Sequence, residues 1–288
     1  MLVIAEANGF RQTCVINRNT MTRILIPTDF SDNAMHAAEY AVKLFGAQGN
    51  TFILLHTYLD LSLADPVMPS ATLELTKISE EGLQEFADRL VHRTGAEHVK
   101  RGVVYGPLPG MLNEMAESTG AEVVVMGKHG KTGTSFFGSN TLSVIQRSKF
   151  PVLAVPESAP LKKVERILLA DDYDDILPRH LGMLRHIATT NTTEVLVGHV
   201  EMAVADGALH WSNGIYELAL QGIPHSFHEA SGEDVIDGLD RLARHKHVDL
   251  IAVLHRHIGL MGRLFHPSTA KDLARYSDLP LLVLEQVD

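Results

Sequence analysis

Hydrophobic residues recur along this chain in short continuous runs, and each run is followed by a segment in which they recur every three or four positions. The runs at 23–27, 52–57 and 123–126 are dominated by apolar residues. Such runs are typical of strands in a parallel sheet whose two faces are both covered by helices. Alternation of these strands with amphipathic segments predicts doubly wound α/β architecture with five parallel strands per domain.

Three helices are expected between the first strands. The first should follow Ser31 or Asp32, either of which is suited to cap it. Its apolar stripe comprises Met35, Ala38, Val42 and Phe45. The second is expected over 72–94, and the third after Pro107. The residues of the second helix expected to face inward are Ile78, Leu83, Phe86, Leu90 and Val91.

The strand pattern occurs twice. The matched segments are 23–32 with 166–175, 52–57 with 195–200, 123–126 with 250–253, and 150–155 with 279–284. Four matched strands in the same order indicate a duplicated domain. The predicted organisation is a first domain at 21–157, a linker at 158–163 and a second domain at 164–288, with prolines and charged residues near the junction.

The first twenty residues do not fit this pattern. They show no helical or strand period of useful length, so residues 1–20 are predicted to be an extraneous or flexible arm. Met21, directly before the first strand, is then an alternative natural start. An ordinary frayed terminus explains the same pattern equally well.

Composition narrows the classes of function. Of 288 residues, 45% are hydrophobic and 21% charged, which excludes wholesale disorder. The net charge of −10 argues against binding to nucleic acid or to an anionic membrane. The single cysteine, Cys14, excludes an internal disulfide and a multi-cysteine metal site. No signal peptide is visible and no apolar run approaches the ~18 residues of a membrane span, so a cytoplasmic protein is expected.

Two segments of the first repeat carry candidate chemistry. In doubly wound sheets ligands bind beyond the carboxyl ends of the strands. The first segment is 27–29, where the first strand ends; the second is the glycine-rich stretch 126–141 after the fourth strand. Asp29 could accept hydrogen bonds from ribose hydroxyls, and a helix-capping role explains this carboxylate equally well.

The glycine-rich stretch suits a phosphate. Glycines allow an anion to approach the backbone, and free N–H groups at a helix start can hold it. The hydroxyls of Ser139 and Thr141 and the charges of Lys128 and Lys131 would add to this site. The alternative is a strand-to-helix turn in a domain that has lost its ligand.

In order and spacing, the motifs PTDFS, ILLHT, MGKHGKTG, GSNT and PVLAVP resemble those of the universal stress proteins. The resemblance covers 21–156 strongly and 164–288 as a diverged second copy. It implies two tandem Rossmann-like domains, of the adenine nucleotide alpha hydrolase-like type, with an adenine nucleotide site in the first. The site residues that it implies are Pro27, Thr28, Asp29, Thr57, Met126, Gly127, Gly130, Gly138, Ser139, Asn140 and Thr141.

The sequence departs from the family pattern in both repeats. The ATP-binding pattern is G-x2-G-x9-G-[ST], whereas seven residues separate Gly130 from Gly138 here. The shorter loop favours ADP or AMP, or no ligand, over ATP, with Mg²⁺ as an accompanying ion. In the second repeat Leu254, His257 and Pro267 stand where glycines belong, which predicts a degenerate half.

The resemblance therefore implies a cytoplasmic stress-response regulatory module that binds an adenine nucleotide in its first domain. No catalytic or metal-binding residue is predicted. Pairing of the last strands, 150–155 and 279–284, would give an internal pseudo-dimer, and homodimers are a further alternative. Two other functions stay open: a ligand-free module that binds protein partners, and a protein with weak ATPase or autophosphorylating activity.

Overall fold

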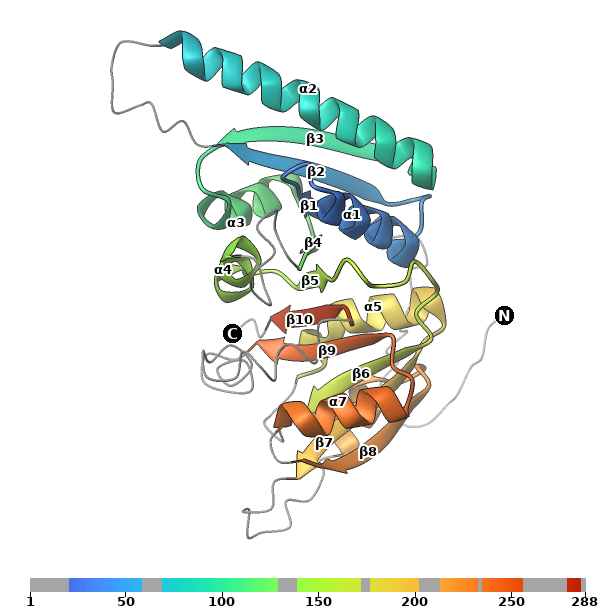
Figure 1. Cartoon of the computed structure of the whole chain (residues 1–288). Helices are drawn as coiled ribbons and strands as arrows, with labels where there is room; N and C mark the ends of the chain where they lie inside the picture. Colours follow the sequence, from blue (N-terminus) through green and yellow to red (C-terminus); the bar gives the residue numbers. More distant parts are fainter. Residues whose placement is uncertain are drawn as a thin grey trace, which may run out of the picture.

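The computed structural model of the chain describes residues 21–58, 69–128, 139–171, 177–201, 213–232, 235–255 and 279–285. Residues 1–20, for which an arm was predicted, lie outside this part of the chain. Strands and helices alternate through both halves (Figure 1). The first half comprises β1 (Arg23–Pro27), α1 (Asp32–Phe45), β2 (Thr51–Tyr58), α2 (Pro69–Thr94), β3 (His98–Tyr105), α3 (Leu108–Thr119), β4 (Val123–Gly127), α4 (Ser139–Arg147) and β5 (Val152–Val155).

The second half follows the same alternation, with a 3₁₀ turn before its first α-helix. Its elements are β6 (Arg166–Asp171), η2 (Pro178–Leu181), α5 (Gly182–Asn191), β7 (Glu194–Glu201), α6 (Asn213–Ala219), β8 (His225–Ser231), α7 (Val235–His245), β9 (Leu250–His255) and β10 (Leu281–Glu285). The predicted α/β class is confirmed.

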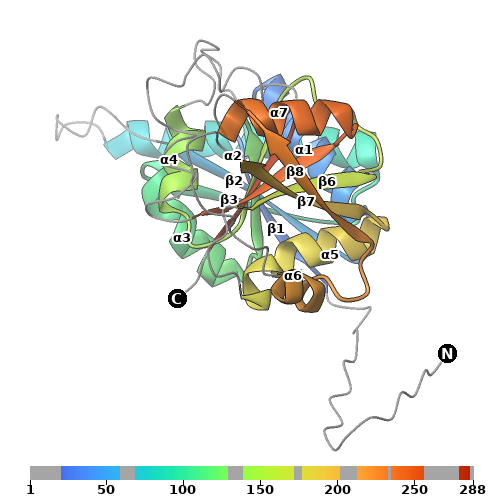
Figure 2. The same cartoon turned by 90° about the horizontal axis from the view of Figure 1, so that it is seen from below.

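The ten strands of the described residues form one sheet in the order β3-β2-β1-β4-β5-β10-β9-β6-β7-β8. Each half contributes five parallel strands in equivalent order, and the two sets meet where β5 and β10 pair antiparallel, with Leu153 opposite Leu282. Figure 2 shows the strands fanned out by the twist of this sheet. The two last strands thus pair within one chain.

Helices cover both faces of the sheet. Residues of α1, α2, α5 and α6 share one hydrophobic core, whereas α3, α4 and α7 share the other. Strands buried on both sides explain the continuous apolar runs in the sequence. Within the described residues, no helix has both the length and the apolar character needed to cross a bilayer.

The hydrogen bonds at the amino ends of the strands repeat between the halves. Glu122 N donates to Arg23 O, and Asp249 N donates to Arg166 O, each at 2.9 Å. These matched bonds identify Glu122 and Asp249 as equivalent positions. The predicted linker is held against both halves: His36 Nε2 donates to Ala159 O at 2.8 Å, and Lys162 Nζ lies 2.6 Å from Asp249 Oδ1.

Helix α1 forms as the sequence predicts. The Ser31 hydroxyl accepts a hydrogen bond from Ala34 N at 3.1 Å and caps the helix. The four residues of the predicted stripe are all buried.

The prediction for α2 is correct in part. Leu83, Phe86 and Leu90 are buried, but Ile78 and Val91 are 58% and 41% exposed. At 3.6 residues per turn, Ile78 lies about 140° and Val91 about 80° around the helix from Leu83. Helix α2 packs over the edge of the sheet, so the buried stripe is narrower than the apolar pattern suggested.

Candidate functional site

Three neighbouring strands end together at the carboxyl edge of the first half. Strand β1 pairs with both β2 and β4, and all three run parallel. Beyond β1, Thr28 N donates to Leu55 O of β2 at 2.9 Å. The predicted residues at 27–29, Thr57 on β2, and the 126–127 end of β4 therefore lie at one edge of the sheet.

The turn after β1 is built from its own polar side chains. Phe30 N donates to Thr28 Oγ1 at 3.0 Å. Asp29 Oδ1 accepts from both Ser31 N, at 3.0 Å, and Ser31 Oγ, at 2.5 Å. Asp29 thus does not cap α1 itself. Its carboxylate orients Ser31, which caps the helix, while Asp29 stays half-buried at the carboxyl edge.

An aromatic pair that the residue pattern does not reveal lies beside this turn. The rings of Phe30 and His56 are stacked, with centroids 4.3 Å apart and planes at 25°. His56 Nδ1 donates to Thr28 O at 2.8 Å, so the histidine is tied to the same turn. Phe30 has φ +64°, a left-handed conformation that is uncommon for a bulky residue and could not be predicted from the residue type.

The end of β4 requires a glycine for a reason apart from any ligand. A Cβ on Gly127 would lie 2.4 Å from Asn33 Nδ2 and 3.3 Å from Asn33 O, at the start of α1. Met126 is buried in the core on the face of α3 and α4. A side chain at residue 127 would therefore collide with the start of α1.

Helix α4 is fastened to the same strand end. The buried Thr141 hydroxyl donates to Gly127 O at 2.8 Å. That bond uses the proton of the hydroxyl that was expected to hold an anion, so Thr141 positions the start of α4. Asn140 is exposed, and Ser139 is the first residue of α4. Gly130, Gly138 and Lys131 lie outside the described residues.

Lys128 was expected to place a positive charge in the phosphate loop, but its side chain points elsewhere. The residue is fully buried, and its Nζ donates across the junction of the two halves to Leu279 O at 3.4 Å. Its backbone N donates to Val155 O at 2.8 Å, which continues the pairing of β4 with β5. The first half therefore meets the second directly behind the candidate site.

The equivalent strand end in the second half carries a large side chain. Gly127 pairs with Val155 on β5, and Leu254 pairs with Leu284 on β10, which places Leu254 at the position of Gly127. Leu254 is buried. His257 and Pro267 lie outside the described residues. In the part of the chain that is described, no group of three or more His, Cys, Asp and Glu side chains is arranged to hold a metal ion.

Comparison with known proteins gives consistent matches. The model of the universal stress protein family matches residues 20–156. Universal stress protein G of Escherichia coli O157:H7 is 32% identical over 152 residues, covering 46% of this chain and 96% of that protein. A universal stress protein of Methanocaldococcus jannaschii is 28% identical over 152 residues, covering 46% of this chain and 93% of its own length.

Solved structures also resemble nearly the whole chain. The crystal structure of a universal stress protein from Archaeoglobus fulgidus has a TM-score of 0.71 and 21% identity, and the match covers 92% of this chain and 97% of that one. This likeness shows that the fold of both halves occurs in a single solved chain.

Proposed function

Because this chain belongs to the universal stress protein family, we propose that residues 21–157 form a regulatory domain that binds an adenine nucleotide at the carboxyl edge of its sheet. One observation carries this proposal: the ends of β2, β1 and β4 bring Thr57, Asp29 and Gly127 to the same edge. This is the edge at which doubly wound sheets bind ligands.

In this proposal each segment has its own task. Asp29, held by Ser31, accepts hydrogen bonds from the ribose hydroxyls through its free carboxylate oxygen positions. Pro27, Thr28, Thr57 and Met126 shape the base pocket from the strand ends. The bare backbone from Gly127 onward faces the phosphates. The residues assigned to that part are Gly127, Gly130, Gly138, Ser139, Asn140 and Thr141.

The nucleotide should carry few phosphates. The loop between Gly130 and Gly138 is short, and the Lys128 ammonium and the Thr141 proton are already bonded within the protein. ADP or AMP is therefore preferred to ATP. Mg²⁺, where it accompanies the nucleotide, would be held mainly by phosphate oxygens, since the described residues offer no cluster of metal ligands.

Residues 164–288 are proposed to form a second, ligand-free domain that supports the first, with 158–163 as the linker. Leu254 stands at the strand position equivalent to Gly127 and adds a buried side chain there, which supports this assignment. The whole chain would then act as a cytoplasmic stress-response module. The negative net charge supports partners other than nucleic acids and membranes, and a homodimer is a further proposal.

Calorimetric titration with ATP, ADP and AMP tests the proposal. We expect binding by the wild-type chain, and Asp29→Asn should weaken it about 10-fold because it replaces a charged acceptor by a neutral one. Asp88→Asn, on the exposed face of α2, is the matched control and should bind as the wild type does. The proposal would be refuted if all three nucleotides at millimolar concentration gave neither a heat of binding in the titration nor an increase in the melting temperature.

A ligand-free interaction module is the second candidate function. The engaged Lys128 and Thr141 favour it, because each is a group that a phosphate would otherwise use. It predicts that no adenine nucleotide raises the melting temperature, while a protein partner is recovered with the wild-type chain. Phosphate release that is abolished by Asp29→Asn would instead indicate weak ATPase activity.

A further inference from the structure

The residue that follows Asp29 has an unusual backbone. Phe30 has φ +64°, and the other described non-glycine residues with positive φ, Thr192 and His247, lie where helices end. For a bulky L-residue this conformation is unfavourable, because Cβ crowds the neighbouring carbonyl. Strained residues persist where surrounding contacts hold them, and such positions cluster at binding sites.

The contacts that hold Phe30 come from two other elements. Its ring stacks on His56 of β2 at 4.3 Å and lies 6.3 Å from the ring of Phe86 on α2. A Cβ on Gly82 of α2 would lie 3.2 Å from the Phe30 ring, so the absence of a side chain there lets α2 close over it. The ring is thus clamped between the sheet and α2.

The clamp and the turn support each other. His56 is fixed by its bond to Thr28 O, and Phe30 N is bonded to Thr28 Oγ1. The left-handed conformation of Phe30 reverses the direction of the chain. Ser31 N and Ser31 Oγ can therefore both donate hydrogen bonds to Asp29 Oδ1. A normal φ at residue 30 would turn the carboxylate of Asp29 to a different direction.

We propose that Phe30 is a positioning residue of the nucleotide site: its ring, clamped between His56 and Gly82, holds the left-handed turn that aims Asp29 at the ligand. The inference rests on the proposed function of this edge. It adds a role for Phe30, which supports the turn that contains Asp29 and does not contact the ligand itself. The ring supplies the contacts that compensate for an unfavourable backbone.

Alanine and glycine should have different effects when they replace Phe30. Alanine removes the clamp and keeps the preference for negative φ, so Phe30→Ala should let the turn relax. Glycine also removes the clamp, but it adopts positive φ readily, so Phe30→Gly should keep the turn. A residue that served only to pack would show the reverse order, because glycine is the smaller and the more flexible replacement.

The test compares the two variants by ADP titration and by amide hydrogen exchange of Ser31 and Ala34, whose N–H groups are bonded to the turn's side chains. We expect Phe30→Ala to weaken ADP binding about 10-fold and Phe30→Gly to stay within about 3-fold of the wild type. Exchange should accelerate in Phe30→Ala and change little in Phe30→Gly. Equal effects, or a larger effect of glycine, overturn the proposal.

Two further variants keep the test decisive. Phe30→Leu, which retains an apolar side chain but no aromatic face, replaces Phe30→Ala if the latter does not fold, and the same order against Phe30→Gly is expected. Gly82→Ala pushes on the ring and should weaken ADP binding about 3-fold. If the wild-type chain binds no nucleotide, the proposed function fails, and the order of the exchange rates then supports or overturns only the part of the proposal in which the Phe30 ring holds the left-handed turn.

Discussion

The two halves of this chain share a sheet but differ at both of its edges. In the first half, residues 28–31 form a tight turn from β1 into α1, which brings Asn33 against Gly127. In the second, residues 172–177 separate β6 from η2, and Leu254 fills the position equivalent to Gly127. Equivalent ends of two strands in one fold can thus carry either a glycine or a bulky leucine where the segments that follow β1 and β6 differ in length.

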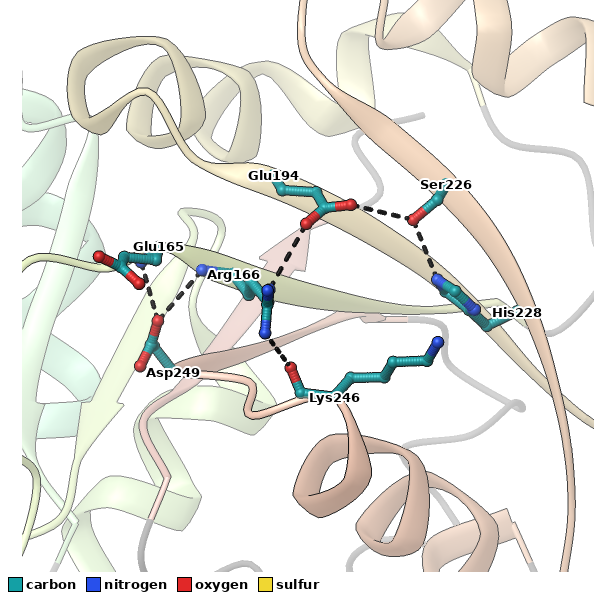
Figure 3. A network of polar contacts seen from close by, with 7 residues as sticks. All are labelled: Glu165, Arg166, Glu194, Ser226, His228, Lys246 and Asp249. Carbon is teal, nitrogen blue, oxygen red and sulfur yellow. Dashed lines mark hydrogen bonds and ion pairs between the residues drawn. The ribbon is translucent and has the colours of Figure 1, made fainter.

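The amino ends of the strands also differ between the two halves, in the number of hydrogen bonds that the equivalent carboxylates accept. Asp249 Oδ2 accepts from Glu165 N and Arg166 N at 2.8 and 3.1 Å (Figure 3). Its other oxygen, Oδ1, lies 2.6 Å from Lys162 Nζ. The equivalent Glu122 accepts from Arg23 N at 3.3 Å. The second half is therefore the more firmly tied at the edge that faces away from the strand ends of the candidate site.

Transferring the bulky residue to the first half should give the largest effect. Gly127→Leu forces Cβ against Asn33 Nδ2 and should lower the free energy of unfolding by about 3 kcal/mol, because overpacked sites cannot relax freely. Urea denaturation measures this loss. Gly127→Ala should cost less when Asn33→Ala is also present, and an equal cost in both backgrounds would show that the contact with Asn33 is not the cause.

Removing the two equivalent carboxylates should break the symmetry of the amino edge. Asp249→Ala leaves two backbone N–H groups and Lys162 without their acceptor and should cost about 2 kcal/mol. Glu122→Ala, on the exposed side of the same edge, should cost less than about 0.5 kcal/mol. Equal losses in urea denaturation would contradict the comparison.

Contacts between the halves should differ in their response to pH. Tyr40 of α1 is buried, and this burial raises its pKa above the ordinary tyrosine value, with the negative charge of Asp249 raising it further. His186 of α5 in the second half contacts Thr22 of the first half, with Nε2 3.0 Å from Thr22 Oγ1. Burial lowers the pKa of His186, against an opposing effect of Glu122.

A histidine with a lowered pKa favours the folded state while it is neutral. As the pH falls below about 6.5, the unfolded chain takes up the proton first, so the free energy of unfolding decreases. The wild type should therefore lose more of its free energy of unfolding than His186→Gln does between pH 7 and pH 5, as measured by urea denaturation at the two pH values. His92→Gln, exposed on α2, should follow the wild type; if His186→Gln does so too, His186 is not the titrating group.

Substitutions at two helix ends should have effects of about 1 kcal/mol or less. Gly120 and His247 follow α3 and α7 with φ of +66° and +52°. Because glycine adopts this conformation without strain, His247→Gly should raise the free energy of unfolding by about 0.5–1 kcal/mol. Gly120→Ala should lower it by about 1 kcal/mol. Thermal and urea unfolding measure both, and a destabilising His247→Gly would point to a contact of the imidazole.

The sequence pattern predicted what depends on local periodicity. Continuous apolar runs located the strands, and the stripe from Met35 to Phe45 located α1, because burial on two faces or on one leaves a direct trace in residue order. The meeting of the 27–29 and 126–127 segments also followed, since parallel strands that are neighbours end at a common edge.

The contacts made by individual side chains could not be predicted in this way. Lys128 reaches into the other half to Leu279, which is 151 residues away in the sequence. The left-handed Phe30 depends on a ring from β2 and a glycine from α2. Ile78 and Val91 are exposed because α2 covers only the margin of the sheet, and no local pattern reveals where a sheet stops.

The antiparallel joint between β5 and β10 lies within one polypeptide, so its formation is unimolecular and dilution cannot undo it. In a two-fold assembly of identical subunits, every substitution at the axis is made twice. Here a change at Leu153 need not be copied at Leu282, and Lys128 can cross the joint without a lysine returning from the equivalent His255. A joint formed within one chain thereby leaves its two sides free to mutate separately.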